Sequence, residues 1–348
     1  MVFHQERSPI MPKVTILMPT FNVAPWVEEA IRSVLAQTYQ DFELLVMDDC
    51  STDNTLEVVR SIHSPKIRIE KNEHNLGLSA NLNRGLSLID TEYVARMDGD
   101  DIAEPTWLEK EVAILDVHPE IGICGAGWEW FGSKSGTGRY PELPEDNKAN
   151  LLFGCSVIVP TFRMSLYRDL GLRYREDAFP AEDYRFWVDC VRHTQIYNIQ
   201  ETLFHYRMHP SQICTSKRMA QLEKVAETRR TMLLWLAPDL AENEVQYFLN
   251  SFAQGVISSK QELRQARLFS KKLLHCNAKE GNCSSVALKN RIHSLIVLAV
   301  YDYVVRTYFS QGYSLRKYAN YLFSGMAFHT NRKYEIKFFA KSVLHKHA

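Results

Sequence analysis

The first hundred residues alternate between short apolar runs and amphipathic segments, and this alternation constrains the fold more than any other feature of the chain. Continuous apolar runs of this length are typical of buried parallel strands, and they lie at Val14 to Met18, Phe42 to Met47, Ile67 to Glu70 and Tyr93 to Met97. Segments with a helical pattern follow the first three runs. The order predicts an α/β fold with a mostly parallel sheet and helices on both faces.

From about Lys217 the pattern changes to long helical segments with few strand-like runs. We therefore expect three parts: a flexible N-terminus at residues 1–12, an α/β domain at 13–215 and a mainly α-helical region at 216–348. Polar clusters follow Met18, Met47 and Met97. Because ligands bind beyond the carboxyl ends of parallel strands, these clusters predict one site built from three separated loops.

Charge is distributed unevenly, although the formal net charge of the 348 residues is zero. Residues 216–348 contain 21 basic and 9 acidic side chains, and the basic excess lies on segments that look amphipathic, such as YDYVVRTYF. Such a region can face an anionic membrane, the acidic half of its own molecule or a partner subunit, so oligomers through these helices are one option. No nucleic-acid-binding motif accompanies the charge, so we expect no nucleic-acid partner.

The cysteine spacing, the N-terminal segment and the length of the apolar stretches indicate the cellular compartment of the protein. The seven cysteines are widely spaced without a CxxC pair, which favours reduced thiols. The N-terminal segment lacks the features of a secretory signal, and the longest apolar stretch, Ser294 to Val305, is too short to span a bilayer. We expect a cytoplasmic protein, either free or peripherally attached to the inner face of the cell membrane.

The cluster Asp98-Gly99-Asp100-Asp101 directly follows an apolar strand. Three carboxylates in four residues repel one another unless a cation lies among them, and oxygen ligands that share a shell with phosphates suit Mg²⁺ or Mn²⁺. A solvated acidic turn is the alternative. The cluster predicts a divalent-metal site next to a diphosphate.

The two other loops predict a nucleotide site. An acid such as Asp49 at the end of the second strand can accept hydrogen bonds from a base or ribose, while Ser51 and Asp53 suit helix capping. In Pro19-Thr20-Phe21-Asn22, at the end of the first strand, an aromatic face and a backbone turn could hold a planar base.

Taken in order, PTFN, VMDDCSTDNT, NLGLSANLNRGL and RMDGDD resemble family 2 glycosyltransferases over about residues 13–215. The resemblance implies a Rossmann-like GT-A fold. It further implies that Pro19, Phe21 and Asp49 border the nucleobase, with Asn22 counted among the donor-binding residues, that Asp98 lies near the ribose or the metal, and that Asp100 ligates the metal. Asn83 and Arg84 fall in the helix motif beside the donor. Where some members place a basic residue near the pyrimidine, this chain has Gly77 and Leu78.

Two later segments complete the resemblance. Ala181-Glu182-Asp183-Tyr184 with Trp187 is similar to the family's ED-x-x-x-W segment, which makes Asp183 the expected catalytic base; a helix-start acid is the alternative. Tyr206 to Gln212 is similar to the YRxHxxQ segment, which implies His209 as a metal or diphosphate ligand and Arg207 as a phosphate partner, unless either is structural. The aromatic residues Trp128, Trp130 and Phe131 fit core packing or an acceptor cleft.

Together with these residues, the resemblance implies an inverting, metal-dependent glycosyltransferase of the hexosyltransferase type. We expect it to move a sugar from a nucleotide diphosphate sugar, with UDP as the default, to a hydroxyl of a glycan or lipid-linked acceptor in cell-surface polysaccharide synthesis. A sugar nucleotidyltransferase and a non-catalytic protein that binds sugar nucleotides are the alternatives. A nucleotidyltransferase would normally carry a loop rich in glycine and basic residues after the first strand. The corresponding segment here, PTFNVAPW, has neither feature.

Overall fold

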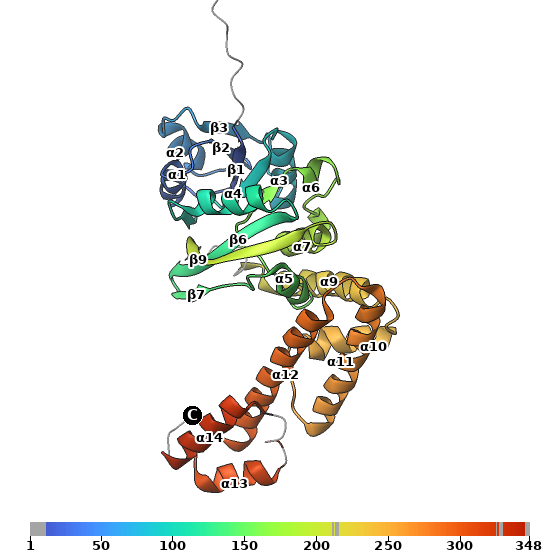
Figure 1. Cartoon of the computed structure of the whole chain (residues 1–348). Coiled ribbons are helices and arrows are strands. Elements are labelled where there is room, and N and C mark those ends of the chain that lie inside the picture. Colours follow the sequence, from blue (N-terminus) through green and yellow to red (C-terminus); the bar gives the residue numbers. More distant parts are fainter. Residues whose placement is uncertain (1–11, 211, 213–215, 325, 327–329, 345–348) are drawn as a thin grey trace, which may run out of the picture. The chain divides into compact units, whose positions relative to one another are not determined.

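A computed structural model describes residues 12–210, 212, 216–324, 326 and 330–344 (Figure 1). The chain forms two compact units, Met1–Thr228 and Arg229–Ala348. The predicted flexible N-terminus at residues 1–12 lies, apart from Pro12, outside the described residues.

A mixed sheet forms the centre of the first unit. Its strands are β1 (Val14–Thr20), β2 (Phe42–Asp48), β3 (Ile67–Lys71), β4 (Tyr93–Arg96), β5 (Ile102–Ala103), β6 (Ile121–Gly132), β7 (Gly136–Gly138), β8 (Thr161–Arg163) and β9 (Gln195–Met208). The order is β3-β2-β1-β4-β8-β6-β9-β5, with β7 paired to β6. The β3-β2-β1-β4 half is parallel, β8 runs antiparallel to both of its neighbours, and the long strands β6 and β9 are parallel.

Helices cover both faces of the sheet, and the alternation along β1 shows how (Figure 1). Val14, Ile16 and Met18 join one apolar core with residues of α1 (Val27–Leu35) and α4 (Trp107–Val117). Leu17 points to the other face and meets α3 (Leu78–Ser87). At Gly85 a Cβ would lie 2.5 Å from a Leu17 methyl group, so glycine lets α3 approach the sheet closely.

The remaining helices of the first unit are α2 (Thr55–Ser61), α5 (Pro144–Asn150), α6 (Ser165–Arg168) and α7 (Glu182–Cys190), with a 3₁₀ turn at Glu176–Ala178. The start of α7 matters most for the site. Its Phe186 and Trp187 are buried and pack against Phe162 of β8, so the acidic first turn is held beside the strand ends.

The second unit is helical in its described residues. Its helices are α9 (Arg218–Leu236), which begins in the first unit, α10 (Glu242–Tyr247), α11 (Lys260–Glu280), α12 (Ser285–Tyr308), α13 (Leu315–Phe323) and α14 (Arg332–Val343), with a π-helical turn at Phe248–Phe252. One aromatic cluster joins Phe248, Phe252 and Phe269, and another joins α12 to α14 through Tyr301 and Phe338. Within the residues described, no helix is both long and apolar enough to cross a membrane.

Candidate active site

The loops that follow β1, β2 and β4 line a cavity of about 780 Å³ in the first unit. This volume lies within the range of about 300–1,000 Å³ that small-molecule sites occupy. Among the predicted site residues, the cavity wall contains Pro19, Phe21, Asn22, Asp49, Asp98, Asp100, Asp183 and His209. The position at the carboxyl ends of the strands is the one expected for a ligand in an α/β sheet.

Asp49 lies at the β2 side of the cavity and is held by three hydrogen bonds. Its Oδ1 accepts from Asn72 Nδ2 at 2.7 Å and from the Leu76 backbone N–H at 2.8 Å, and its Oδ2 accepts from the Gly77 backbone N–H at 2.9 Å. The last two donors lie just before α3, so Asp49 ties the end of β2 to the segment that leads into this helix. The carboxylate has three of its acceptor positions occupied and a fixed orientation.

Asn22 ties the loop after β1 to the loop after β2. Its Oδ1 accepts from Thr52 N at 2.8 Å and Asp53 N at 3.3 Å, and its own N–H donates to Ser51 Oγ at 3.1 Å. Its φ of 55° is left-handed, a conformation that asparagine tolerates better than most residues. The side chain of Asn22 therefore positions the neighbouring Phe21, which is 46% exposed, on the cavity wall.

Arg96, at the end of β4, bridges two of the predicted functional acids. Its Nη1 donates to Asp98 Oδ2 at 2.6 Å and its Nη2 lies 3.7 Å from Asp183 Oδ2. Burial alone would lower the pKa of Arg96, but Asp183 and Asp98 raise it well above its ordinary value. Arg96 is therefore a permanent positive charge between the loop after β4 and the first turn of α7.

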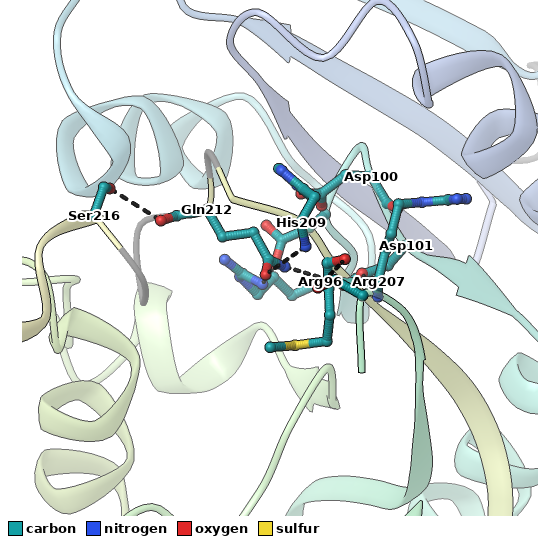
Figure 2. Close-up of polar contacts among 10 residues, drawn as sticks. Arg96, Asp100, Asp101, Arg207, His209, Gln212 and Ser216 are labelled. Atoms are coloured by element: carbon teal, nitrogen blue, oxygen red, sulfur yellow. Dashed lines mark hydrogen bonds and ion pairs between the residues drawn. The ribbon is translucent and has the colours of Figure 1, made fainter. Parts of the chain in front are cut away.

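The carboxylate of Asp100 pairs with His209, which follows β9 (Figure 2). His209 Nε2 lies 2.9 Å from Asp100 Oδ2, and the His209 ring stacks on Trp26 with ring centroids 4.0 Å apart. The His209 backbone N–H donates to Gln212 Oε1 at 3.1 Å. Residues far apart in sequence thus hold one histidine against one carboxylate.

Asp101 and Arg207 also connect the loop after β4 with the end of β9 (Figure 2). Asp101 Oδ1 accepts from the Arg207 backbone N–H at 2.8 Å, and Arg207 Nε donates to the Asp100 carbonyl at 2.7 Å. The Arg207 guanidinium also pairs with Glu29 at 2.5 Å and lies over the Phe131 ring. These contacts anchor the loop after β4 to the end of β9.

The acidic loop has the electrostatics of a cation site. Burial raises the pKa of Asp100, Asp98 adds to the rise and His209 opposes it; burial and both neighbouring carboxylates likewise raise the pKa of Asp101. Among the described residues, no three His, Cys, Asp or Glu side chains gather into a preformed metal cage. Asp100 and His209 contact each other and, with Asp98 in the same loop, could supply part of the ligand shell of a cation whose other ligands are substrate phosphates, as Mg²⁺ commonly binds.

Asp183 faces the cavity from the first turn of α7. Burial raises its pKa, Arg96 opposes that rise and Asp98 adds to it. The adjacent Glu182 is buried, and burial together with Asp183 raises the pKa of Glu182 to about 8. Glu182 is therefore largely protonated near neutral pH. Trp187 is 1% exposed in an aromatic core and acts as the anchor of this helix.

Three residues predicted to contact the donor do not line the cavity. Asn83 exchanges two hydrogen bonds with the Tyr174 backbone, Arg84 binds Asn72 and Glu70, and Arg207 makes the contacts described above. Their polar groups are hydrogen-bonded or ion-paired within the protein. Trp128, Trp130 and Phe131 also lie outside the cavity wall, and Trp128 packs in the core against Tyr140.

The structure adds cavity residues that sequence reasoning did not single out. Arg96, Trp26 and Tyr140 line the wall, and Lys217 and Gln221 reach it from the start of α9. Gln221 Nε2 donates to the Pro180 carbonyl at 3.1 Å and Lys217 Nζ lies 4.5 Å from the centre of the Phe179 ring. The only sequence signal for Arg96 is a charged residue inside an apolar strand, which is costly unless it is paired.

Part of this chain is similar in sequence to known proteins. Residues 15–172 match the sequence model of Glycosyl transferase family 2. A protein of Haemophilus influenzae named an uncharacterized glycosyltransferase is 33% identical over 234 residues, which cover 63% of this chain and 72% of that protein. The chain belongs to glycosyltransferase family 2. An uncharacterized glycosyltransferase of Rickettsia typhi, RT0329, is 30% identical over 63% of this chain and 71% of its own length.

Solved glycosyltransferases share the architecture. Residues 1–349 of Staphylococcus aureus TarS, in complex with UDP-GlcNAc, align with a TM-score of 0.57 at 18% identity, over 84% of this chain and 87% of that one. The mannosyltransferase PcManGT of Pyrobaculum calidifontis, in complex with GDP-Man and Mn²⁺, aligns with a TM-score of 0.50 at 17% identity, over 84% and 88%. The predicted family and the GT-A α/β fold with a helical C-terminal region are confirmed.

Proposed function

We propose that this family 2 glycosyltransferase is an inverting, metal-dependent enzyme that transfers a sugar from a UDP-sugar to a hydroxyl group of a glycan or lipid-linked acceptor in cell-surface polysaccharide synthesis. The observation that carries the proposal is the arrangement of one cavity wall. Asp49 lies at the β2 side of this wall, Asp100 in the loop after β4 pairs with His209 after β9, and Asp183 faces the same cavity from α7.

The hydrogen bonds of Asp49 support uracil as the base. A carboxylate offers about four acceptor positions, and the protein occupies two on Oδ1 and one on Oδ2. One position on Oδ2 remains for the ligand. Uracil presents a single N–H between two carbonyl groups, whereas guanine presents two adjacent N–H donors and would leave one without a partner in a buried site. The exposed ring of Phe21 lies on the same wall and suits stacking on the base.

Asp98, Asp100 and His209 would hold the divalent cation next to the diphosphate, where Mn²⁺ or Mg²⁺ would neutralise charge on the leaving group. Asp183 has the position for a general base. It would accept the proton of the acceptor hydroxyl as that oxygen forms a bond to the anomeric carbon and the bond from that carbon to the diphosphate oxygen breaks. A single displacement from the opposite face inverts the anomeric centre.

Transfer and binding measured on the same protein test this proposal. Asp183→Asn should lose at least about a hundredfold in turnover, measured as nucleoside diphosphate release with acceptor, while donor affinity by calorimetry stays within about threefold. Asp177→Asn, at an exposed acid on the approach to α7, is the matched control and should keep full turnover. Retained turnover in Asp183→Asn would remove the base assignment.

A comparison of nucleotides tests the part of the proposal that concerns the base of the donor. With Mn²⁺ present, UDP should bind at least about tenfold more tightly than GDP, because one unsatisfied buried donor costs about 1–3 kcal/mol. Equal binding of UDP and GDP would contradict the Asp49 argument. Binding of UDP-sugars without release of nucleoside diphosphate in the presence of any acceptor would favour a non-catalytic sugar-nucleotide-binding protein instead.

A further inference from the structure

The hairpin of α13 and α14 in the second unit presents an apolar outward face. Leu315 and Leu322 of α13 and Ile336, Phe339 and Val343 of α14 are all exposed, Ile336 by 62% and Phe339 by 51%. Tyr318 connects the two sets, because its ring centroid lies 5.5 Å from that of Phe339. We call these six residues the α13–α14 apolar face.

The hairpin also has a buried core of its own, so the exposed residues are not left over from incomplete packing. Phe338 and Ser342 of α14 are fully buried, and Phe338 stacks on Phe309 and Tyr301. Ile336, Phe339 and Val343 follow helical spacing on a different side of the same helix. The helix therefore has one apolar stripe that builds the core and a second that faces solvent. Contiguous exposed apolar surface of this kind marks an interaction site.

Cations flank the face. The hairpin segment 309–344 contains six basic side chains and one acid, and the basic residues are Arg316, Lys317, Arg332, Lys333, Lys337 and Lys341. None of the six forms an ion pair with a carboxylate among the described residues. The acid, Glu335, points inward and binds the hydroxyl groups of Tyr321 and Thr330. The outward charge of the hairpin is therefore positive throughout.

We propose that the α13–α14 apolar face docks on an anionic lipid membrane. Apolar side chains on such a helix insert at the boundary between headgroups and acyl chains, while flanking lysines and arginines bind lipid phosphates. Long basic side chains suit this arrangement because their apolar stems can lie along the apolar surface. The inference is independent of the proposed reaction, since it uses no residue of the cavity.

The charge pattern disfavours a second copy of the chain as the occupant. A twofold dimer through this face would bring each row of cations against the identical row of the other copy, without carboxylates to separate them. A membrane containing acidic lipids satisfies the apolar stripe and the cations together. A partner that offers only negative charge would leave the stripe of Ile336, Phe339 and Val343 in water.

Co-sedimentation of the full-length protein with vesicles tests the proposal. The protein should bind vesicles of phosphatidylcholine with about one third phosphatidylglycerol and not vesicles of phosphatidylcholine alone. Ile336→Ser with Phe339→Ser, and separately Lys333→Glu with Lys337→Glu, should each weaken binding at least about tenfold. Because all four side chains are exposed, we expect unchanged thermal unfolding of both variants.

Helix α11 supplies the matched controls, since Leu268 is also an exposed leucine and Arg267 and Lys271 are exposed cations. Leu268→Ser and Arg267→Glu with Lys271→Glu should bind like the wild type. Three results would overturn the proposal: no binding to the anionic vesicles, equal losses in the α11 controls, or a concentration-dependent dimer that Phe339→Ser converts to monomer. Donor affinity measured on the same variants should not change, so failure here leaves the cavity assignment intact.

Discussion

The guanidinium of Arg96 lies 3.7 Å from the carboxylate of Asp183 while it donates at 2.6 Å to Asp98. The proposed base and the acidic loop after β4 therefore share one countercharge. Arg96 is nearly fully buried, so the contact is shielded from solvent more than a surface pair would be. Arg96 thus acts on Asp183 as a positioning residue.

Replacing Arg96 by methionine should remove this link. We expect the free energy of unfolding to fall by about 2 kcal/mol, because two partly buried carboxylates lose their partner, and turnover to fall at least about tenfold. Arg96→Lys should be intermediate, because one ammonium group cannot reproduce the guanidinium fork. Urea unfolding and single-turnover transfer measure both effects. Arg32→Met removes an exposed ion pair with Glu28 and is the control, so it should change the free energy of unfolding by less than about 0.5 kcal/mol. Wild-type turnover in Arg96→Met would contradict the positioning role of Arg96.

The parallel half of the sheet could be predicted from the sequence because its signals are local. Each apolar run is followed at once by a polar cluster, and β1, β2 and β4 lie where the runs predicted them. The other half of the sheet, which mixes parallel and antiparallel pairs, could not be predicted with the same detail. Strand β8 has three residues, and its partners β4 and β6 are distant along the chain, so its pairing is set by tertiary packing.

The candidate site shows the same division. Phe21, Asp49, Asp100 and Asp183 follow or begin regular elements, and the cavity contains all four. Arg207 stands in an equally suggestive segment, but its guanidinium is occupied by Glu29, whose position depends on how α1 packs. Local sequence identifies a side chain that can bind phosphate. Only the tertiary structure shows whether that side chain is already paired with another residue of the protein.

Asn22 offers a test that separates backbone strain from lost hydrogen bonds. Asn22→Gly keeps the left-handed conformation but loses the contacts with Thr52 and Asp53, whereas Asn22→Ala loses the contacts and also strains the backbone. We expect both to weaken UDP binding by displacing Phe21, and alanine to cost about 1 kcal/mol more stability than glycine. Thermal unfolding and calorimetry measure these effects. Equal stability of the two variants would show that the conformation of residue 22 carries no cost.

Trp26 should govern the response to metal through His209. Trp26→Leu removes the ring stacked on His209, and we expect about tenfold more Mn²⁺ to be needed for half-maximal UDP binding, as for other groups that orient a metal ligand. Calorimetry at a series of Mn²⁺ concentrations measures the shift. Phe21→Leu is the control, because it should weaken UDP binding at every Mn²⁺ concentration without shifting the Mn²⁺ midpoint. An unchanged Mn²⁺ midpoint in Trp26→Leu would separate His209 from the metal.

Glu111 should make stability depend on pH, because it is fully buried on α4 and has no ion-pair partner among the described residues. Burial raises the pKa of Glu111 well above its ordinary value, although the Thr161 hydroxyl and backbone N–H donate to it. Above the unfolded-state pKa the unfolded chain releases a proton that the folded chain retains, so stability falls as pH rises toward the folded-state pKa. Glu111→Gln keeps an acceptor for Thr161 and has no proton to lose. Its unfolding free energy should therefore decline less between pH 5 and pH 8 than that of the wild type. Glu57→Gln, at an exposed acid of α2, is the control and should show the same dependence of unfolding free energy on pH as the wild type. If Glu111→Gln also shows the wild-type dependence on pH, Glu111 is already ionised in the folded protein.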